Sequence, residues 1–253
     1  MKSYQVRARA KDYLTGGWKD FAIISLIYIV ILVLVSTIPN LLNAPYIISL
    51  VLQNFINIIL SYGLFSVFWN YSKGQDVKFY EFIVVGFKNI KRAIFIFFHT
   101  ALRLFIPFII MMISIIFAVS SLNGSLIYVA TSSNSSLLLN AILIISIITT
   151  IISFILFISK SLNYVFGNLV GIQYPDLTEK ECVLKCKEFM QGNRKKYLFL
   201  LISFSGWFFV GICTLLIGFI WIFPYLQMSF ISFYEMIQTS KTEKNKKKKR
   251  KNK

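Results

Sequence analysis

The 253-residue sequence has few acidic residues and almost no charge outside four short clusters. It has 10 Asp or Glu against 27 Lys or Arg, a net charge of +17. Of the charged residues, 35 lie in four segments, which are 2–20, 73–92, 160–196 and 241–253. The three segments between them contain only two charges, Arg103 and Glu235. A soluble domain of this size carries more charge than this, so the scarcity excludes an ordinary soluble domain.

Cysteine and histidine are also scarce, which limits metal and catalytic chemistry. The only cysteines are Cys182, Cys186 and Cys213, and His99 is the single histidine. Cys182 and Cys186 share a predicted helix face, but two thiols are half of a zinc site and no further ligand is near in sequence. The H-E-x-x-H, G-x-S-x-G and P-loop patterns are absent. The sequence therefore predicts no enzyme, metal or cofactor, and reduced cysteines in a cytosolic setting.

The sequence is rich in long apolar segments. Hydrophobic residues make up 57% of it, with a mean hydropathy of +0.69. The segments 21–72, 93–159 and 197–240 are each too long for one membrane crossing, which takes about 20 residues, and each fits two. Two crossings return the chain to the side it left, so all four charged clusters share one face. Their excess of Lys and Arg is typical of the cytoplasmic face, and their position beside apolar segments argues against nucleic acid as a partner.

These patterns predict an all-α membrane protein, a six-transmembrane-helix bundle with two cytoplasmic interfacial amphipathic helices. The transmembrane domain covers 21–240, with helices at about 21–38, 46–69, 94–119, 137–159, 197–215 and 218–237. The flanking segments are a cytoplasmic N-terminal amphipathic segment, 1–20, and a disordered polybasic cytoplasmic tail, 241–253. Residues 120–136, rich in Ser and Asn, are expected to form an outer loop. The interfacial helices are expected at about 79–91 and 178–191, the second starting with a Thr178–Glu181 capping box.

Arg103 is the clearest candidate site, because it lies within an apolar segment. If a membrane helix starts at Ile94, Arg103 lies roughly 14 Å along it, near mid-membrane. A charge there usually faces the protein interior. With His99 one turn earlier and the carbonyl freed by Pro107, it would then form a polar site for an anionic group. Alternatively, the interfacial helix extends to about Arg103, whose side chain then reaches the membrane surface.

A second candidate is a polar face on the predicted helix 46–69. Ser49, Gln53, Asn57 and Ser61 follow one another at intervals of four residues. Such a face either lines a cavity or conduit or makes hydrogen bonds to a neighbouring helix. Both alternatives stay open on the sequence. The basic tail likewise either recruits anionic lipid or only fixes the topology.

The chain resembles one family through motifs that occur in the same order and at similar spacing. The motif residues are Arg7, Ala10, Leu14, Gly16, Trp18, Gly63, Phe82, Gly86, Phe87, Pro175, Asp176, Met190, Gly192, Ser203, Phe204, Gly206, Trp207, Gly218, Pro224, Tyr225, Phe233 and Tyr234. The family is a group of bacterial multi-pass membrane proteins labelled domain of unknown function nine-seven-five, found mainly in Gram-positive bacteria. The chain departs from the family pattern before Lys160, where Pro-Gly is usual, and at Cys186, where Ser is usual. The resemblance implies an integral plasma-membrane protein and brings no activity or ligand.

Four of these motif residues have an expected packing role. Gly206 beside Trp207 suits close helix packing. Pro224 frees the carbonyl of Ile220, which predicts a kink in the last membrane helix. Tyr225 and Gln227 are placed either to satisfy that carbonyl or to line a cavity there.

The sequence thus predicts a non-enzymatic membrane protein that acts through lipid or protein partners. Anionic headgroups at the cytoplasmic face, a membrane protein partner and a second copy of the chain are the expected partners. Envelope stress, resistance or immunity, and membership of a larger complex are the expected roles. The alternative is a conduit for a small amphiphile or anion, with a pathway along Ser49, Gln53, Asn57 and Arg103.

Overall fold

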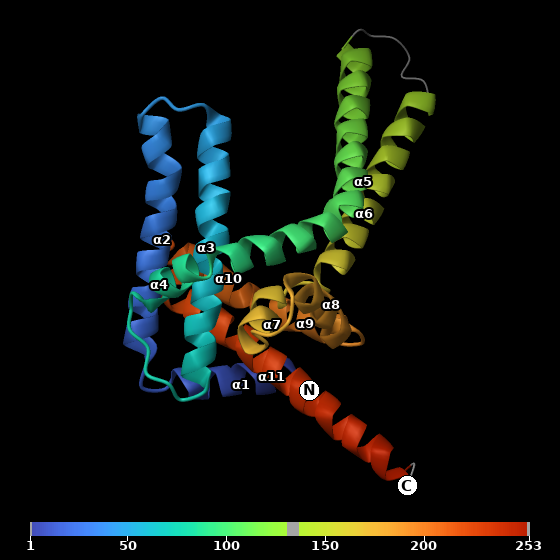
Figure 1. Cartoon of the computed structure of the whole chain (residues 1–253). Coiled ribbons are helices and arrows are strands. Elements are labelled where there is room, and N and C mark those ends of the chain that lie inside the picture. Colours follow the sequence, from blue (N-terminus) through green and yellow to red (C-terminus); the bar gives the residue numbers. More distant parts are fainter. Residues whose placement is uncertain (1, 131–136, 252–253) are drawn as a thin grey trace.

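The computed structural model describes residues 2–130 and 137–251, and every regular element within these ranges is a helix (Figure 1). The helices are α1 Ser3–Leu14, α2 Trp18–Leu41, α3 Tyr46–Ser72, α4 Glu81–Lys88, α5 Ile90–Ala130, α6 Leu137–Ser161, α7 Gly167–Gln173, α8 Glu179–Met190, α9 Arg194–Ile202, α10 Ser205–Cys213 and α11 Phe219–Lys251. The predicted all-α class is therefore confirmed for the described part of the chain.

Five helical segments of the described chain are long and apolar enough to cross a membrane. They are Trp18–Leu41, Tyr46–Ser72, Ile90–Asn123, Asn140–Ser161 and Arg194–Cys213. The sequence predicts six, and the one not among them is 218–237, the first part of α11. Gln227, Ser229, Ser232 and Glu235 interrupt its apolar residues. Ser229, Ser232 and Glu235 are buried, so this part of α11 packs within the protein, and the predicted sixth crossing is not confirmed.

The predicted helix 197–215 is also different in the structure, because it is broken in the middle. α9 ends at Ile202 and α10 begins at Ser205. The side chain of Arg7 donates a hydrogen bond of 3.1 Å to the carbonyl oxygen of Ser203 at the break. α1 thus supplies a partner for a backbone group that lies at the end of a helix and would otherwise lack one.

α5 bends sharply near its middle, so its two halves belong to different parts of the molecule (Figure 1). Pro107 lies inside α5 and cannot donate to the carbonyl of Arg103, which is the ordinary cause of such a bend. Before the bend, Ile96 packs with Tyr62 of α3 and Val183 of α8. Beyond it, α5 runs beside α6, where Thr150 donates a 3.0 Å hydrogen bond to the carbonyl of Ser114.

Two predicted irregular segments are helical where the structure describes them. α5 continues to Ala130, so residues 120–130 of the predicted outer loop are helix, and the rest of that loop, 131–136, lies outside the described residues. Leucine, isoleucine and valine between its serines are compatible with helix. α11 continues to Lys251, beyond residue 241, where the predicted tail begins. Lysine and arginine are good helix formers, and the tail prolongs a helix that is already formed.

Two helices lie close to the positions predicted for the interfacial helices. The predicted helix 79–91 is α4, which ends at Lys88, and the helix 178–191 is α8. The capping box is confirmed, since the Thr178 hydroxyl accepts from the Glu181 N–H while Glu181 accepts from the Thr178 N–H.

The buried core lies at one end of the two long hairpins, α2–α3 and α5–α6. Its members include Val6, Ala10 and Leu14 of α1, Phe21 and Ile24 of α2, Leu64 and Phe68 of α3, Leu169 of α7, Cys186 of α8, and Met228, Ile231, Phe233 and Tyr234 of α11. In Figure 1 the opposite ends of the hairpins extend away from this core. The apolar side chains of those ends are largely exposed, which is the composition that a lipid environment accepts.

Two glycines let the backbones of α3 and α4 touch. A Cβ placed on Gly63 would lie 1.8 Å from the carbonyl oxygen of Phe82, and one on Gly86 would lie 2.6 Å from that of Ile59. Only glycine permits this approach, so the motif residues Gly63, Phe82 and Gly86 meet at one crossing. The crossing fixes α4, and with it the first half of α5, across α3.

Candidate functional site

Arg103 lies just before the bend of α5 and lines a hollow between α5 and α6. The hollow has a volume of about 310 Å³ and is lined by Arg103, Ile106, Pro107, Ile110, Ser153, Leu156 and Lys160. The guanidinium donates one hydrogen bond of 2.9 Å, to the backbone carbonyl of His99. Arg103 and Lys160 therefore bring two positive charges to one apolar hollow.

No carboxylate balances these two charges in the described residues. The ion pairs of that part of the chain are Arg9–Glu235 and Lys73–Glu235, and no acidic residue lines the hollow. The guanidinium has further N–H groups beyond the one bonded to His99. Ile106, Ile110 and Leu156 supply an apolar wall beside the cations. Positive charge next to an apolar wall is the combination that an anionic headgroup with an attached acyl chain requires.

The imidazole of His99 does not join this site. Its ring lies edge-on to Phe98, with centroids 6.0 Å apart, and it does not line the hollow. The predicted polar site of Arg103, His99 and a free carbonyl is therefore replaced by a pair of cations. α5 runs crosswise to α3 before its bend and then along α6 (Figure 1).

The polar face of α3 lies mainly against α2. The Ser49 hydroxyl donates to the side-chain oxygen of Asn40 at 3.2 Å, and the Tyr28 hydroxyl donates to that of Asn57 at 2.7 Å. These are the interhelical hydrogen bonds of the structural alternative. Gln53 lies between Ser49 and Asn57 and is half-buried. Ser49 and Asn57 thus bond within one hairpin, and Arg103 lines a hollow in the other, so the structure does not bring the predicted pathway together.

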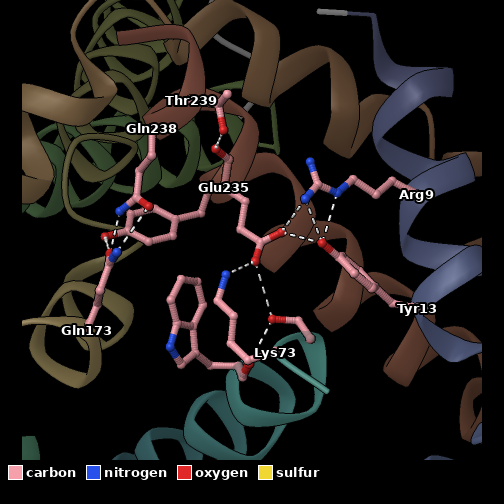
Figure 2. A network of polar contacts seen from close by, with 10 residues as sticks. Arg9, Tyr13, Lys73, Gln173, Glu235, Gln238 and Thr239 are labelled. Carbon is pink, nitrogen blue, oxygen red and sulfur yellow. Dashed lines mark hydrogen bonds and ion pairs between the residues drawn. The ribbon is translucent and has the colours of Figure 1, made fainter. Parts of the chain in front are cut away.

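The other charge of the apolar segments, Glu235, is the centre of a buried polar network (Figure 2). Its side chain is 6% exposed and forms ion pairs with Arg9, at 3.0 Å, and with Lys73. The side chains of Arg9 and Lys73 are 43% and 46% exposed. The Tyr13 hydroxyl donates to it at 2.6 Å. Burial and this hydrogen bond raise the pKa of Tyr13. The network ties α1, α3 and α11 together.

Glu235 has no role among the predicted sites, although its position in the sequence marks it out. Glu235 is one of only two charges in the apolar segments, and a buried carboxylate is rare unless it is paired. Its partners Arg9 and Lys73 belong to charged clusters far away in the sequence, where nothing marks them out from neighbouring cations. The site was therefore detectable, but its partners were not.

Arg92 performs a similar structural task on the other side of the core. Its guanidinium donates to the carbonyl oxygens of Pro175 at 3.0 Å, Tyr174 at 2.9 Å and Leu177 at 3.0 Å. The family-like Pro175-Asp176 turn between α7 and α8 is thereby fixed to α5. Only arginine has a planar guanidinium group with enough N–H donors to bind three carbonyl oxygens in this way.

The motif residues of α10 and α11 have a role different from the predicted one. A Cβ on Gly206 would meet nothing within 4 Å, so the predicted close packing at Gly206 is wrong. Pro224 lies inside α11, as predicted. The Tyr225 ring packs against Trp18, Phe204 and Trp207, with centroids 6.1, 5.1 and 5.9 Å away. Trp207 and Tyr225 thus join α2, α10 and α11.

The cysteines do not form a metal site in the described part of the chain. No group of three His, Cys, Asp or Glu side chains comes together there. Cys182 and Cys186 are buried in α8, and the Cys186 thiol donates to the carbonyl of Asn163. Burial raises the pKa of Cys186 to about 12. These two thiols are therefore packing groups.

Together, the five apolar helical segments and the lipid-compatible hairpins define an α-helical multi-pass membrane protein. The model of a family described as protein of unknown function (DUF975) matches residues 1–241. The chain belongs to this family, and the resemblance carried by its motifs is confirmed. No curated protein and no solved structure matches the chain.

Proposed function

We propose that this protein is a non-enzymatic plasma-membrane protein that binds anionic lipid headgroups through Arg103 and Lys160. The observation that carries the proposal is the hollow between α5 and α6, where two cations without a carboxylate partner in the described residues adjoin an apolar wall. A headgroup phosphate accepts hydrogen bonds from both cations, and Ile106, Ile110 and Leu156 accept the beginning of an acyl chain. We further propose that the protein acts through lipid and membrane partners, in envelope stress, in resistance or immunity, or within a larger complex.

The proposal includes a topology with both chain termini in the cytoplasm. The charged clusters carry an excess of Lys and Arg, which favours the cytoplasmic side. The ends of the α2–α3 and α5–α6 hairpins that lie away from the core point the same way in Figure 1. Arg103 and Lys160 lie at the core end of their hairpin, so this topology puts them at the inner leaflet, where anionic lipids attract basic side chains.

Native mass spectrometry of the protein released from membranes with phosphatidylglycerol tests this function. The double variant Arg103→Gln/Lys160→Gln is compared with Lys180→Gln/Lys187→Gln, which removes the same charge from exposed positions of α8. Because each basic residue near a membrane contributes about 1 kcal/mol, the first pair should reduce retained anionic lipid roughly 10- to 30-fold. Equal retention by both double variants would refute the proposal.

A further inference from the structure

Three of the four tryptophans of the chain line a single hollow at the junction of four helices. Trp18 comes from α2, Trp207 from α10 and Trp221 from α11. Tyr225 and Ile222 of α11 and Lys11 of α1 complete the lining, and the volume is about 200 Å³. This hollow shares no residue with the one at Arg103 and Lys160. It is a separate site, and nothing in the proposed function depends on it.

The aromatic rings are held at angles that leave part of their surfaces uncovered. Trp18 lies at 49° to Tyr225 and Trp207 at 80°, so neither ring stacks flat on it. Trp207 and Trp221 remain 44% and 51% exposed. Tilted and edge contacts are stable aromatic arrangements, so this wall is formed without a ligand and has ring surface left to contact one.

The polar groups of the hollow are all suited to an anion. Among residues 2–123 and 140–241, whose side chains the structure describes, Lys11 has no ion-pair partner. The indole N–H groups of the three tryptophans make no hydrogen bond within the same ranges. No carboxylate lines the hollow. Aromatic walls often bind quaternary ammonium groups, but the Lys11 charge opposes a cation here. An acceptor with negative charge is favoured instead.

The size and position of the hollow indicate which part of a ligand it takes. A volume of about 200 Å³ is smaller than the roughly 300–1,000 Å³ of sites that enclose a whole small molecule. It therefore holds one end of a longer molecule. The exposed faces of Trp207 and Trp221 continue the apolar wall outward, and tryptophan is typical of the membrane–water boundary.

We infer that the tryptophan hollow binds an anionic amphiphile, a carboxylate or phosphate group attached to an alkyl chain. Lys11 contacts the anionic group, the indole N–H groups are available as further donors, and the rings of Trp18, Trp207 and Trp221 cover the first carbons of the chain. The remainder of the alkyl chain lies along the exposed indoles toward lipid. The site joins α1 to the membrane helices, so ligand occupancy adds contacts between them.

Tryptophan fluorescence reports this site directly, because a brominated alkyl chain quenches indoles that it touches. The full chain is placed in phosphatidylcholine nanodiscs. It is then exposed to dibromostearate, to dibrominated phosphatidylglycerol or to dibrominated phosphatidylcholine as the neutral reference. At equal content, the anionic probe that binds should quench about fivefold more effectively than the neutral one. Lys11→Gln should remove this preference, while Lys180→Gln on α8 should keep it.

Each outcome decides the inference. A preference for stearate identifies a free single-chain amphiphile, a preference for phosphatidylglycerol identifies a lipid headgroup, and either result supports the site if Lys11→Gln removes it. Equal quenching by anionic and neutral probes, or an unchanged preference in Lys11→Gln, would overturn it. No tryptophan lines the Arg103–Lys160 hollow, so Arg103→Gln should leave the quenching unchanged. The two proposals therefore fail independently.

Discussion

The carboxylate of Glu235 lies 3.0 Å from the guanidinium of Arg9, which joins the last helix of the chain to the first. Lys73 at the end of α3 pairs with the other oxygen. The three residues belong to three different segments of the sequence, and each of those segments also contributes to the buried core. The network therefore positions α1, whose Lys11 lines the tryptophan hollow.

Glu235→Gln should weaken this assembly, because it removes the charge that balances Arg9 and Lys73. Since both cations are partly solvated, the expected loss in free energy of unfolding is about 2 kcal/mol, below the cost of breaking a fully buried pair. Unfolding in mixed micelles measures it. Glu188→Gln, an exposed carboxylate of α8, is the control and should change stability by less than about 0.5 kcal/mol. A similar loss in both variants would contradict the role of the network.

Gly63→Ala should destabilise the α3–α4 crossing. The added methyl group would meet the backbone carbonyl of Phe82, which cannot move away as a flexible side chain can. Overpacking of this kind typically costs about 1–3 kcal/mol. Gly206→Ala is the matched control, since its methyl group meets open space and alanine favours helix by up to about 1 kcal/mol. Thermal unfolding should rank the wild type between the two, and an equal effect would count against the crossing.

The thiols should differ in reactivity according to burial. Cys213 is exposed, whereas Cys182 and Cys186 are buried. Burial raises the pKa of Cys182, and that of Cys186 to about 12, so at pH 8 these two remain neutral as well as shielded. Mass spectrometry after N-ethylmaleimide treatment should find one label on the folded protein and three after denaturation. Rapid labelling of Cys186 in the folded protein would show that α8 is not packed as described.

The capping box of α8 should give this helix a sensitivity to acid. Hydrogen bonds from the Thr178 backbone and hydroxyl lower the pKa of Glu181 below its ordinary value of 4.5. The stabilisation is therefore complete above that value and is lost as the pH falls through the lower pKa of the folded state. Hydrogen exchange in the first turn of α8, corrected for intrinsic rates, should rise in this range. Glu181→Gln should show no such rise, and the same pH response in both proteins would exclude the capping box as its cause.

Charge patterning and helical periodicity predicted much of the fold. The two long hairpins, the crosswise segment before Arg103 and the start of α8 follow from local composition, spacing and capping. The predicted sixth membrane helix is not confirmed, because polar residues lower the hydropathy of α11 and its apolar residues contact α1, α2 and α3. The same apolar residue types face the protein core and the lipid, so the sequence alone does not distinguish a helix buried in protein from one that contacts lipid.

For the candidate sites, the sequence indicated individual residues but not the partners that the fold brings beside them. Arg103 stood out because it is a charge in an apolar segment, but its neighbour Lys160 belongs to a cluster where cations are frequent. Trp207 and Tyr225 were marked as motif residues, yet their meeting with Trp18 and Lys11 depends on how α1, α2, α10 and α11 pack. Pairings across helices that are distant in sequence require the tertiary structure.

The most direct test of the lipid-binding account is an experimental structure of the protein in nanodiscs that contain phosphatidylglycerol. The account predicts phosphate density in contact with both Arg103 and Lys160, with the acyl chain beside Ile106, Ile110 and Leu156. A hollow filled by protein side chains, or by acyl chain alone with both cations turned to solvent, would contradict it.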